Sequence, residues 1–232
     1  LIPGALEVIE KLRKKGVPYR FLTNTTTRSR KTIANKLQME GLFVTENQII
    51  SAAHVGGIYL KEAGVRSCHL LLEEDAKEEF IGFDLDSKSP EYVVIGDIGI
   101  RWDYELMNQA FRFLQEGARL LALHRGRYFQ GVSGLQLDGG AFVAGLEYAS
   151  GVKAKCVGKP EKSFFKLALK DLSLKSAEVL VVGDDIENDI AGALQAGLKS
   201  CLVKTGKFRE DVLQKSSIKP DLIIDSIAQL KC

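Results

Sequence analysis

The sequence predicts an α/β fold with a mostly parallel sheet. Short apolar runs, several of them rich in β-branched residues, alternate along the chain with longer segments of helical period. Strands that alternate with helices form parallel sheets, because each helix carries the chain back across the sheet. Glycines follow several of the helical segments, as is common at helix ends. The 232 residues are enough for one large domain or two modest ones.

The predicted strands are short apolar runs that lead into polar residues or glycine. They are expected at residues 19–22, 68–72, 92–95, 120–123, 153–157, 179–182, 200–203 and 222–224. The helices are expected at residues 6–12, 29–39, 104–116, 142–150, 163–172 and 188–196, with a helical turn at 226–230. Residues 84–90, rich in Asp, Ser and Lys, are expected to form a surface loop.

The composition is that of an ordinary globular protein. Hydrophobic residues make up 45% and charged residues 27% of the chain, and the net charge is +2. The sequence has no basic block of the kind that would predict binding to nucleic acid or to a membrane surface. No apolar run approaches the roughly 18 residues that a membrane span needs. The four cysteines are scattered without a CxxC pair, which predicts reduced thiols, a cytoplasmic location and neither a disulfide framework nor zinc; they are Cys68, Cys156, Cys201 and Cys232.

The acidic cluster at residues 183–189 is the strongest candidate for a site. The apolar run 179–182 predicts a buried parallel strand, covered on both faces, and Gly183 then turns the chain into Asp184 and Asp185. Asp189 follows near a helix start, where negative charge is favoured. Crowded carboxylates repel one another, and Mg²⁺ relieves this because it prefers oxygen ligands. A solvated acidic helix cap is the alternative, and the segment favours the metal.

A run of small polar residues follows the strand at 19–22. Thr23 and Asn24 begin it, and the segment has two possible roles. The hydroxyls could cap the helix at 29–39. Alternatively, the Thr23 hydroxyl and the backbone N–H groups of the loop could bind phosphate. The residues themselves do not decide between these roles.

Two basic segments also lie just past predicted strands. His124, Arg125 and Arg127 could bind an acidic or phosphorylated substrate, although a solvated loop is favoured because arginine is usually exposed. Lys159 precedes Pro160, which biases it towards an extended backbone and directs its ammonium towards the strand ends. Taken alone, a solvent-exposed lysine is again the favoured interpretation.

The segment Lys204-Thr205-Gly206-Lys207 resembles a phosphate-binding loop only in part. A Walker A motif needs a glycine six positions before its lysine and a serine or threonine after it, but Cys201 and Phe208 occupy those positions. A Rossmann dehydrogenase is set aside as well, because no GxGxxG follows a strand.

The order of the individual motifs is more specific than any one of them. Thr-Asn at a strand end, Lys before Pro, and an acidic cluster at another strand end are the parts that phosphoryl transfer by a carboxylate nucleophile requires. A receiver domain would carry its acidic residues before Thr and Lys, so it is set aside. The segments FLTNT, VGKP and VVGDDIENDI resemble the second, third and fourth motifs of the haloacid dehalogenase (HAD) superfamily of phosphatases. The similarity covers essentially the whole chain.

The resemblance implies a fold and a domain organisation. A Rossmann-like core with a parallel sheet would comprise residues 1–51 and 151–232. An α/β cap domain would be inserted at residues 52–150 and would select the substrate. His124, Arg125 and Arg127 would be the cap's substrate contacts by this resemblance.

The resemblance also assigns roles to residues of the predicted core. Thr23 would donate its hydroxyl to the phosphate, with help from the Asn24 backbone. Lys159 would neutralise the phosphoryl oxygens and steady the nucleophile. Asp184 would bind Mg²⁺, and Asp189 would support the metal directly or through water. Asp185 stands at a position that varies in the family, so its role is expected to be peripheral.

One family motif is missing from the sequence. The first motif is a strand that ends in Asp-x-Asp-Gly or a close variant, it carries the nucleophile, and it belongs just before Pro3. Neither Asp84 nor Asp97 has that context. Because the chain begins with Leu1 instead of Met, we expect on the order of 10–20 further residues upstream.

The sequence therefore predicts a Mg²⁺-dependent, HAD-type phosphatase that works through an aspartyl-phosphate on a nucleophile upstream of this chain. The expected partner is a small phosphorylated molecule or a phosphoamino acid, and the assembly considered is a homodimer through the cap. The alternative is a non-catalytic, phospholigand-binding or scaffold protein that lacks the nucleophile. The first motif distinguishes the two.

Overall fold

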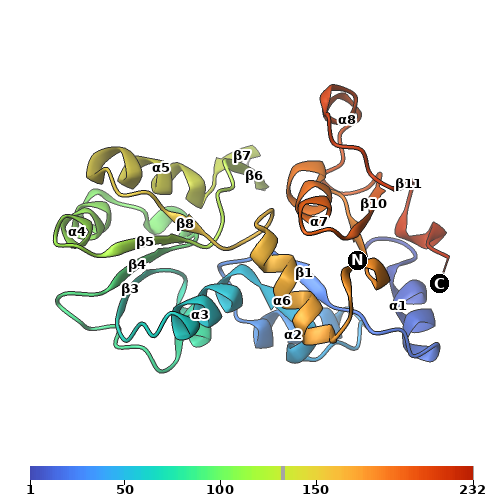
Figure 1. The fold of residues 1–232 in the computed structure, drawn as a ribbon, viewed down its shortest axis with the longest axis horizontal. Helices are drawn as coiled ribbons and strands as arrows, with labels where there is room; N and C mark the ends of the chain where they lie inside the picture. Colours follow the sequence, from blue (N-terminus) through green and yellow to red (C-terminus); the bar gives the residue numbers. More distant parts are fainter. Residues whose placement is uncertain (132–133, 232) are drawn as a thin grey trace. The chain divides into compact units, whose positions relative to one another are not determined.

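The computed structural model describes residues 1–131 and 134–231 (Figure 1). Contacts between residues divide the chain into two compact units. The first unit comprises Leu1–Phe21, Ala34–Ile49 and Lys159–Cys232, and the second comprises Leu22–Ile33 and Ile50–Gly158. Each unit has its own parallel sheet, so the predicted α/β fold class is confirmed.

The first unit is built on a three-stranded parallel sheet with the order β11-β10-β9. These strands are β9 (Leu180–Gly183), β10 (Lys199–Val203) and β11 (Leu222–Ile224). The helices of this unit are α1 (Ala5–Lys14), α6 (Lys162–Leu172), α7 (Ala191–Gln195) and α8 (Glu210–Lys215). Its short helical turns are η1 (Glu46–Gln48), η4 (Ser176–Glu178), the π-helical η5 (Ile186–Ile190) and η6 (Ile227–Gln229).

Strand β9 is not buried on both faces, so this prediction was wrong. Leu180 is 42% exposed, and the other three residues of the strand are only half-buried. The reason is its position, since β9 pairs with β10 and forms the edge of its sheet among the residues described. A continuous apolar run is typical of a central strand, but its burial depends on neighbours on both sides.

The second unit is built on a four-stranded parallel sheet with the order β3-β4-β5-β8. These strands are β3 (Cys68–Leu71), β4 (Tyr92–Ile95), β5 (Arg119–Ala122) and β8 (Lys155–Cys156). The helices of this unit are α3 (Ala52–Glu62), α4 (Tyr104–Gln115) and α5 (Gly139–Ser150), with the 3₁₀ segments η2 (Glu74–Phe80) and η3 (Gly99–Arg101).

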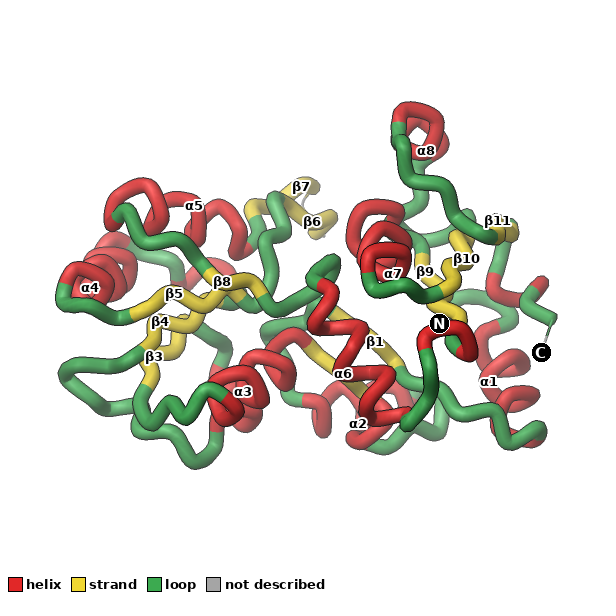
Figure 2. The backbone as a smooth tube through the Cα atoms, viewed as in Figure 1, coloured by secondary structure: helices red, strands yellow, loops and turns green. Residues whose placement is uncertain are grey.

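Alternate residues of β4 show how the helices of the second unit cover both faces of its sheet. Val93 belongs to a core cluster that includes Leu114 of α4 and Leu146 of α5. The neighbouring Tyr92 points to the other face, where its ring contacts Tyr59 of α3 edge to face. Figure 2 shows α4 and α5 on one side of these strands and α3 on the other.

Several elements differ from the predicted pattern. Strand β1 (Phe21–Thr23) pairs with β2 (Ile49–Ser51), and the sequence did not predict β2. An antiparallel hairpin of β6 (Tyr128–Gly131) and β7 (Gly134–Leu137) was also not predicted. The helix α2 (Arg30–Met39) begins one residue after its predicted start.

The predicted domain boundaries stay a prediction. They assigned residues 22–33 to the core, whereas the contacts place Leu22–Ile33 with the second unit. Cys68, Cys156 and Cys201 are free and buried, and Cys232 lies outside the described residues. None of the helices within the described part of the chain is both long and apolar enough to cross a bilayer.

Candidate active site

The end of β9 places a buried ion pair beside the acidic cluster. Asp189 lies inside η5 and is 7% exposed. Its Oδ1 accepts a hydrogen bond from Lys159 Nζ at 2.6 Å, and its Oδ2 accepts one from the Asp185 backbone N–H at 3.3 Å. A Cβ atom at Gly183 would overlap the Asp189 carboxylate, so the strand end needs glycine here. The Lys159 side chain is 12% exposed, which excludes the interpretation of a solvent-exposed lysine.

Asp185 caps a helix, which is the role that the alternative to a metal site proposed for the whole acidic cluster. Its Oδ1 accepts the backbone N–H groups of Glu187 and Asn188 at 3.1 and 2.9 Å. Its Oδ2 accepts the side-chain amide of Asn188 at 2.8 Å. Both oxygens are therefore engaged at the start of η5, and Asp185 is a helix cap.

Asp184 contacts the turn that follows β10. Its Oδ2 accepts a hydrogen bond from the Lys207 backbone N–H at 2.7 Å. Lys207 Nζ lies 3.9 Å from Asp185 Oδ2, but the Lys207 side chain is 71% exposed, so this pair contributes little.

The carboxylates at the end of β9 can supply the protein's share of a Mg²⁺ coordination shell. Within the described ranges, no three His, Cys, Asp or Glu side chains gather as a metal cage. Mg²⁺ commonly takes only one or two protein carboxylates and completes its shell with water and substrate phosphate. One oxygen of Asp184 accepts no hydrogen bond from the part of the chain that the structure describes, whereas both oxygens of Asp189 have donors. Direct coordination by Asp184 and support from Asp189 fit this arrangement.

Thr23 and Asn24 belong to the second unit, whereas Lys159, Asp184 and Asp189 belong to the first. The Thr23 hydroxyl oxygen accepts the Thr25 backbone N–H at 3.2 Å and lies 2.7 Å from the Thr25 hydroxyl. It closes its own turn and does not cap α2.

Ser29 supplies the cap of α2. Its Oγ accepts the Thr32 backbone N–H at 3.3 Å. The capping role considered for the Thr23 segment therefore belongs to a later residue.

Asn24 lies beside the third motif. A Cβ atom at Gly158 would lie 2.9 Å from Asn24 Oδ1 and 3.2 Å from the Cβ of His124, and it would overlap the Leu123 carbonyl oxygen. Only glycine allows this close approach of three segments. The structure thus brings the second motif, the end of β5 and the start of the third motif together within one unit.

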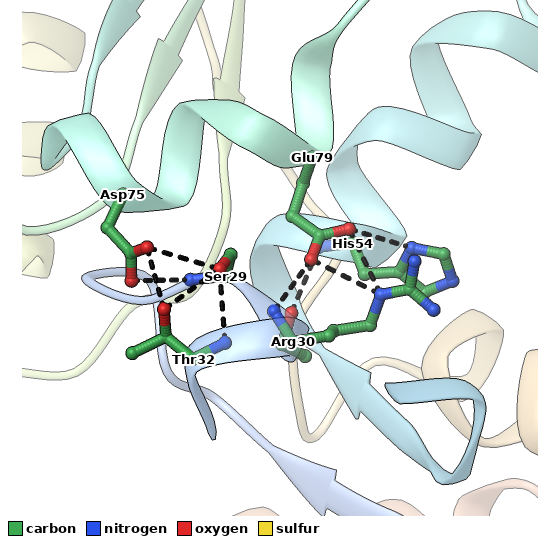
Figure 3. A network of polar contacts seen from close by, with 7 residues as sticks. Ser29, Arg30, Thr32, His54, Asp75 and Glu79 are labelled. Atoms are coloured by element: carbon green, nitrogen blue, oxygen red, sulfur yellow. Dashed lines mark hydrogen bonds and ion pairs between the residues drawn. The ribbon is translucent and has the colours of Figure 1, made fainter. Parts of the chain in front are cut away.

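Two carboxylates of η2 hold the start of α2, as Figure 3 shows. Asp75 accepts hydrogen bonds from the Ser29 backbone N–H at 3.0 Å, from the Ser29 hydroxyl at 3.2 Å and from the Thr32 hydroxyl at 2.8 Å. These bonds satisfy N–H and O–H donors at a helix start, where negative charge is favoured.

Glu79 forms the second half of this network. It accepts the Arg30 backbone N–H at 2.8 Å and pairs with Arg30 Nε at 3.1 Å and with His54 Nδ1 at 3.2 Å. Its side chain is 5% exposed. Burial alone would raise the pKa of Glu79, but the hydrogen bonds from His54 and Arg30 and their charges together hold this pKa below its usual value. Glu79 is therefore a charged, buried anchor for the segment that follows Thr23 and Asn24.

The three basic residues after β5 have three different surroundings. His124 is buried, its Nδ1 accepts the Gly126 backbone N–H at 3.0 Å, and its Nε2 lies 3.5 Å from Asp138 Oδ1. Because Nδ1 is an acceptor, the ring proton is on Nε2, facing Asp138. His124 thus helps to fold its own loop, and the solvated-loop interpretation is wrong for this residue.

Arg125 and Arg127 differ in how their guanidinium groups are held. Arg125 forms two hydrogen bonds with Glu147, at 3.0 and 2.7 Å. The Arg125 guanidinium lowers the pKa of Glu147 to about 2. Arg127 is exposed and is the more available of the two for a ligand.

Comparison with known proteins places these features in a family. A family model described as haloacid dehalogenase-like hydrolase matches residues 1–86, and one described as HAD-hydrolase-like matches residues 156–230. Phospholysine phosphohistidine inorganic pyrophosphate phosphatase of Rattus norvegicus is 36% identical over 230 residues, which cover 98% of this chain and 84% of the relative. This chain belongs to the haloacid dehalogenase-like hydrolase family.

Other members of this HAD-like hydrolase family support the same assignment. Haloacid dehalogenase-like hydrolase domain-containing protein 2 of Mus musculus is 39% identical over 225 residues, which cover 97% of this chain and 86% of that protein. The p-nitrophenyl phosphatase from Archaeoglobus fulgidus superposes with a TM-score of 0.90 at 30% identity, covering 97% of this chain and 89% of the other. NagD from E. coli K-12 superposes with a TM-score of 0.91 at 28% identity, covering 99% and 91%. The predicted resemblance is confirmed.

Sequence reasoning missed several residues of this HAD-like site. Gly158 was considered only as part of a motif, and Asp75 and Glu79 were not singled out. These carboxylates act on residues 43 to 49 positions away in the chain, and no local spacing signals that. The turn at Gly206 was considered and set aside as an incomplete phosphate loop, although its glycine was a usable signal.

Proposed function

We propose that this HAD-like hydrolase is a Mg²⁺-dependent phosphatase that hydrolyses a phosphomonoester or a related P–N bond through an aspartyl-phosphate. The observation that carries the proposal is the buried Lys159–Asp189 pair, at 2.6 Å, beside Asp184 at the end of β9. An ammonium and carboxylates at a strand end are what phosphoryl transfer needs, because catalysis of this reaction is mostly charge stabilisation. The names of the relatives agree with this reaction class.

The residues of the chain have separate roles in this proposal. The Thr23 hydroxyl and the Asn24 backbone N–H bind the phosphoryl oxygens, and the Lys159 ammonium neutralises them. Asp184 would hold Mg²⁺, with Asp189 in support while it orients Lys159. The bound ion would reduce the repulsion between the attacking carboxylate and the phosphate dianion.

The nucleophile is proposed to lie on a further strand, upstream of Leu1, that pairs with the open edge of β9. Support for this comes from the half-exposed apolar residues of β9 and from its single strand partner among the described residues. Unpaired strand edges with apolar side chains favour the addition of another strand. A strand parallel to β9 would bring its carboxyl end to the same edge of the sheet as Asp184.

The remaining parts of the proposal concern the whole protein. Residues 52–150 would form the cap that selects a small phosphorylated molecule or a phosphoamino acid, with Arg127 as its most available contact. The protein would work in the cytoplasm, bind neither nucleic acid nor membrane, and dimerise through the cap. Arg125 is held by Glu147, so its substrate role would require a change of partner.

The test is phosphate release by the full-length product of the reading frame. A panel of phosphorylated metabolites, phosphoamino acids, phospholysine and phosphohistidine is assayed with Mg²⁺ and with EDTA. We expect Mg²⁺-dependent release from at least one compound. Saturable binding without release from any compound would instead establish the phospholigand-binding alternative.

A further inference from the structure

The carboxylate of Asp184 rests on the backbone of the turn at residues 204–207. Its Oδ2 accepts the Lys207 backbone N–H at 2.7 Å. A Cβ atom at Gly206 would overlap the same oxygen, and Gly206 has a φ of +58°, which favours glycine. Two independent features thus favour glycine at position 206, namely its backbone angle and the closeness of the Asp184 carboxylate.

The turn itself is fixed at both ends. The Lys204 backbone N–H donates to the Ile224 carbonyl of β11 at 2.9 Å, and the Phe208 backbone N–H donates to the Thr205 carbonyl at 3.0 Å. The Phe208 ring packs against a buried cluster formed by Ile186, Ile190 and Leu202. Because Ile186 and Ile190 belong to η5, the turn is attached to the same segment that carries Asp189.

We infer that Gly206 and the Lys207 backbone N–H are positioning elements that orient Asp184 as a metal ligand. This inference rests on the proposed function, in which Asp184 holds Mg²⁺. The N–H fixes one carboxylate oxygen and the side-chain rotamer, and the other oxygen accepts no hydrogen bond from the described residues. A neutral N–H donor leaves the full negative charge available, and partners of this kind orient metal ligands in other proteins.

The contribution is made by the backbone and not by the lysine side chain. Lys207 is 71% exposed at its side chain, and its ammonium lies 3.9 Å from Asp185 Oδ2. Removing the side chain leaves the N–H in place, whereas adding a Cβ at Gly206 displaces the carboxylate. Substitution of Gly206 should therefore weaken metal binding, whereas substitution of the neighbouring Lys207 should not.

The experiment measures binding of Mn²⁺ alone, as a stand-in for Mg²⁺, by electron paramagnetic resonance titration of the full-length protein. For Gly206→Ala we expect the dissociation constant to rise by about 10- to 100-fold. For Lys207→Ala we expect less than about a fivefold change. In activity assays, Gly206→Ala should raise the half-saturating Mg²⁺ concentration by a similar factor.

Gly197→Ala is the matched control for backbone strain. Gly197 follows α7 with a φ of +76°, and a Cβ there meets no atom within 4 Å. Both glycine variants should lose similar thermal stability, but only Gly206→Ala should lose metal affinity. Equal Mn²⁺ affinities in the two variants would overturn the inference.

Two further measurements separate the possible failures. If Asp184→Ala binds Mn²⁺ as tightly as the parent protein, the metal role in the proposed function is itself wrong. If Asp184→Ala loses binding but Gly206→Ala does not, only the positioning role is wrong. Should Gly206→Ala not fold, the parent protein gives the answer: the Lys207 amide resonance should shift on Mg²⁺ titration with the midpoint of metal binding, and an unmoved resonance would overturn the inference.

Discussion

The ammonium of Lys159 lies 2.6 Å from Oδ1 of Asp189, and both side chains are almost fully buried, at 12% and 11% exposed. A buried charge is stable only when it is paired, so each residue requires the other. The pair keeps a positive charge beside Asp184 at the end of β9. A phosphate dianion would be attracted by this charge, and the carboxylate of Asp189 prevents the lysine from turning to solvent.

Replacement of Lys159 should affect both stability and turnover. Lys159→Ala leaves Asp189 buried without its cation, so we expect a loss of about 3–5 kcal/mol in the free energy of unfolding. Phosphate release should fall by about 10²–10³-fold in the folded variant. Lys162→Ala, an exposed lysine on α6, is the control and should change neither quantity appreciably. Undiminished turnover in Lys159→Ala would exclude its catalytic role.

Glu79 should be the most sensitive residue of the network in Figure 3. Glu79→Ala removes the partner of the mostly buried Arg30 guanidinium, and we expect a loss of about 3–5 kcal/mol in urea denaturation. The neighbouring Glu78 is exposed, so Glu78→Ala should stay within about 0.5 kcal/mol of the parent protein. Equal stabilities of the two variants would show that the network does not hold the start of α2.

The Arg125–Glu147 pair should give a pH-dependent contribution to stability. The pKa of Glu147 in the folded protein is about 2, below its ordinary value of 4.5, because Arg125 donates to the carboxylate. Its contribution is therefore complete above about pH 4.5 and is lost as the pH falls towards 2.

The variant Arg125→Ala tests this pair. Since Arg125 is 43% exposed, we expect it to lower the free energy of unfolding by only about 1–2 kcal/mol at pH 7. The difference from the parent protein should shrink as the pH falls from 4.5 to 2. A difference that is constant over this range would contradict the assignment. Arg127→Ala is the stability control.

Arg127 is the basic residue of the predicted cap that is most available to a substrate. If Arg127 binds the phosphorylated ligand, Arg127→Ala should raise KM by about tenfold and leave kcat unchanged. The reason is that such a contact stabilises the bound substrate and the transition state equally. Arg112 of α4 is also exposed, so Arg112→Ala is the control for a simple loss of positive charge. An identical KM in both variants would remove Arg127 from the list of substrate contacts.

The local pattern of apolar and polar residues was sufficient to predict most of the helices and strands. The run Tyr92–Ile95 is a strand in the predicted position, since four consecutive apolar residues fill the centre of a parallel sheet. The hairpin of β6 and β7 was missed because its strands carry glycine and glutamine and lack a continuous apolar run. Burial of β9 was overestimated, because a sequence run does not reveal how many strands lie beside it.

The motifs predicted which strand ends carry polar groups, but not how those groups are held. Lys159 was expected to be exposed when considered alone, and the buried Asp189 that pairs with it is 30 residues away. The contact between Asn24 and Gly158 likewise depends on the path of β5 between them. Interactions of this kind follow from the fold, so a linear pattern contains no direct signal for them.

The most direct test of the account is the rate of Mg²⁺-dependent phosphate release by Asp184→Ala, with Asp185→Asn as the control. Asparagine also caps helices, so Asp185→Asn should keep both its fold and most of its activity. We predict that Asp184→Ala, folded as judged by its circular dichroism and melting temperature, loses at least about 10²-fold in phosphate release. Unchanged release by folded Asp184→Ala would contradict the proposed phosphatase site.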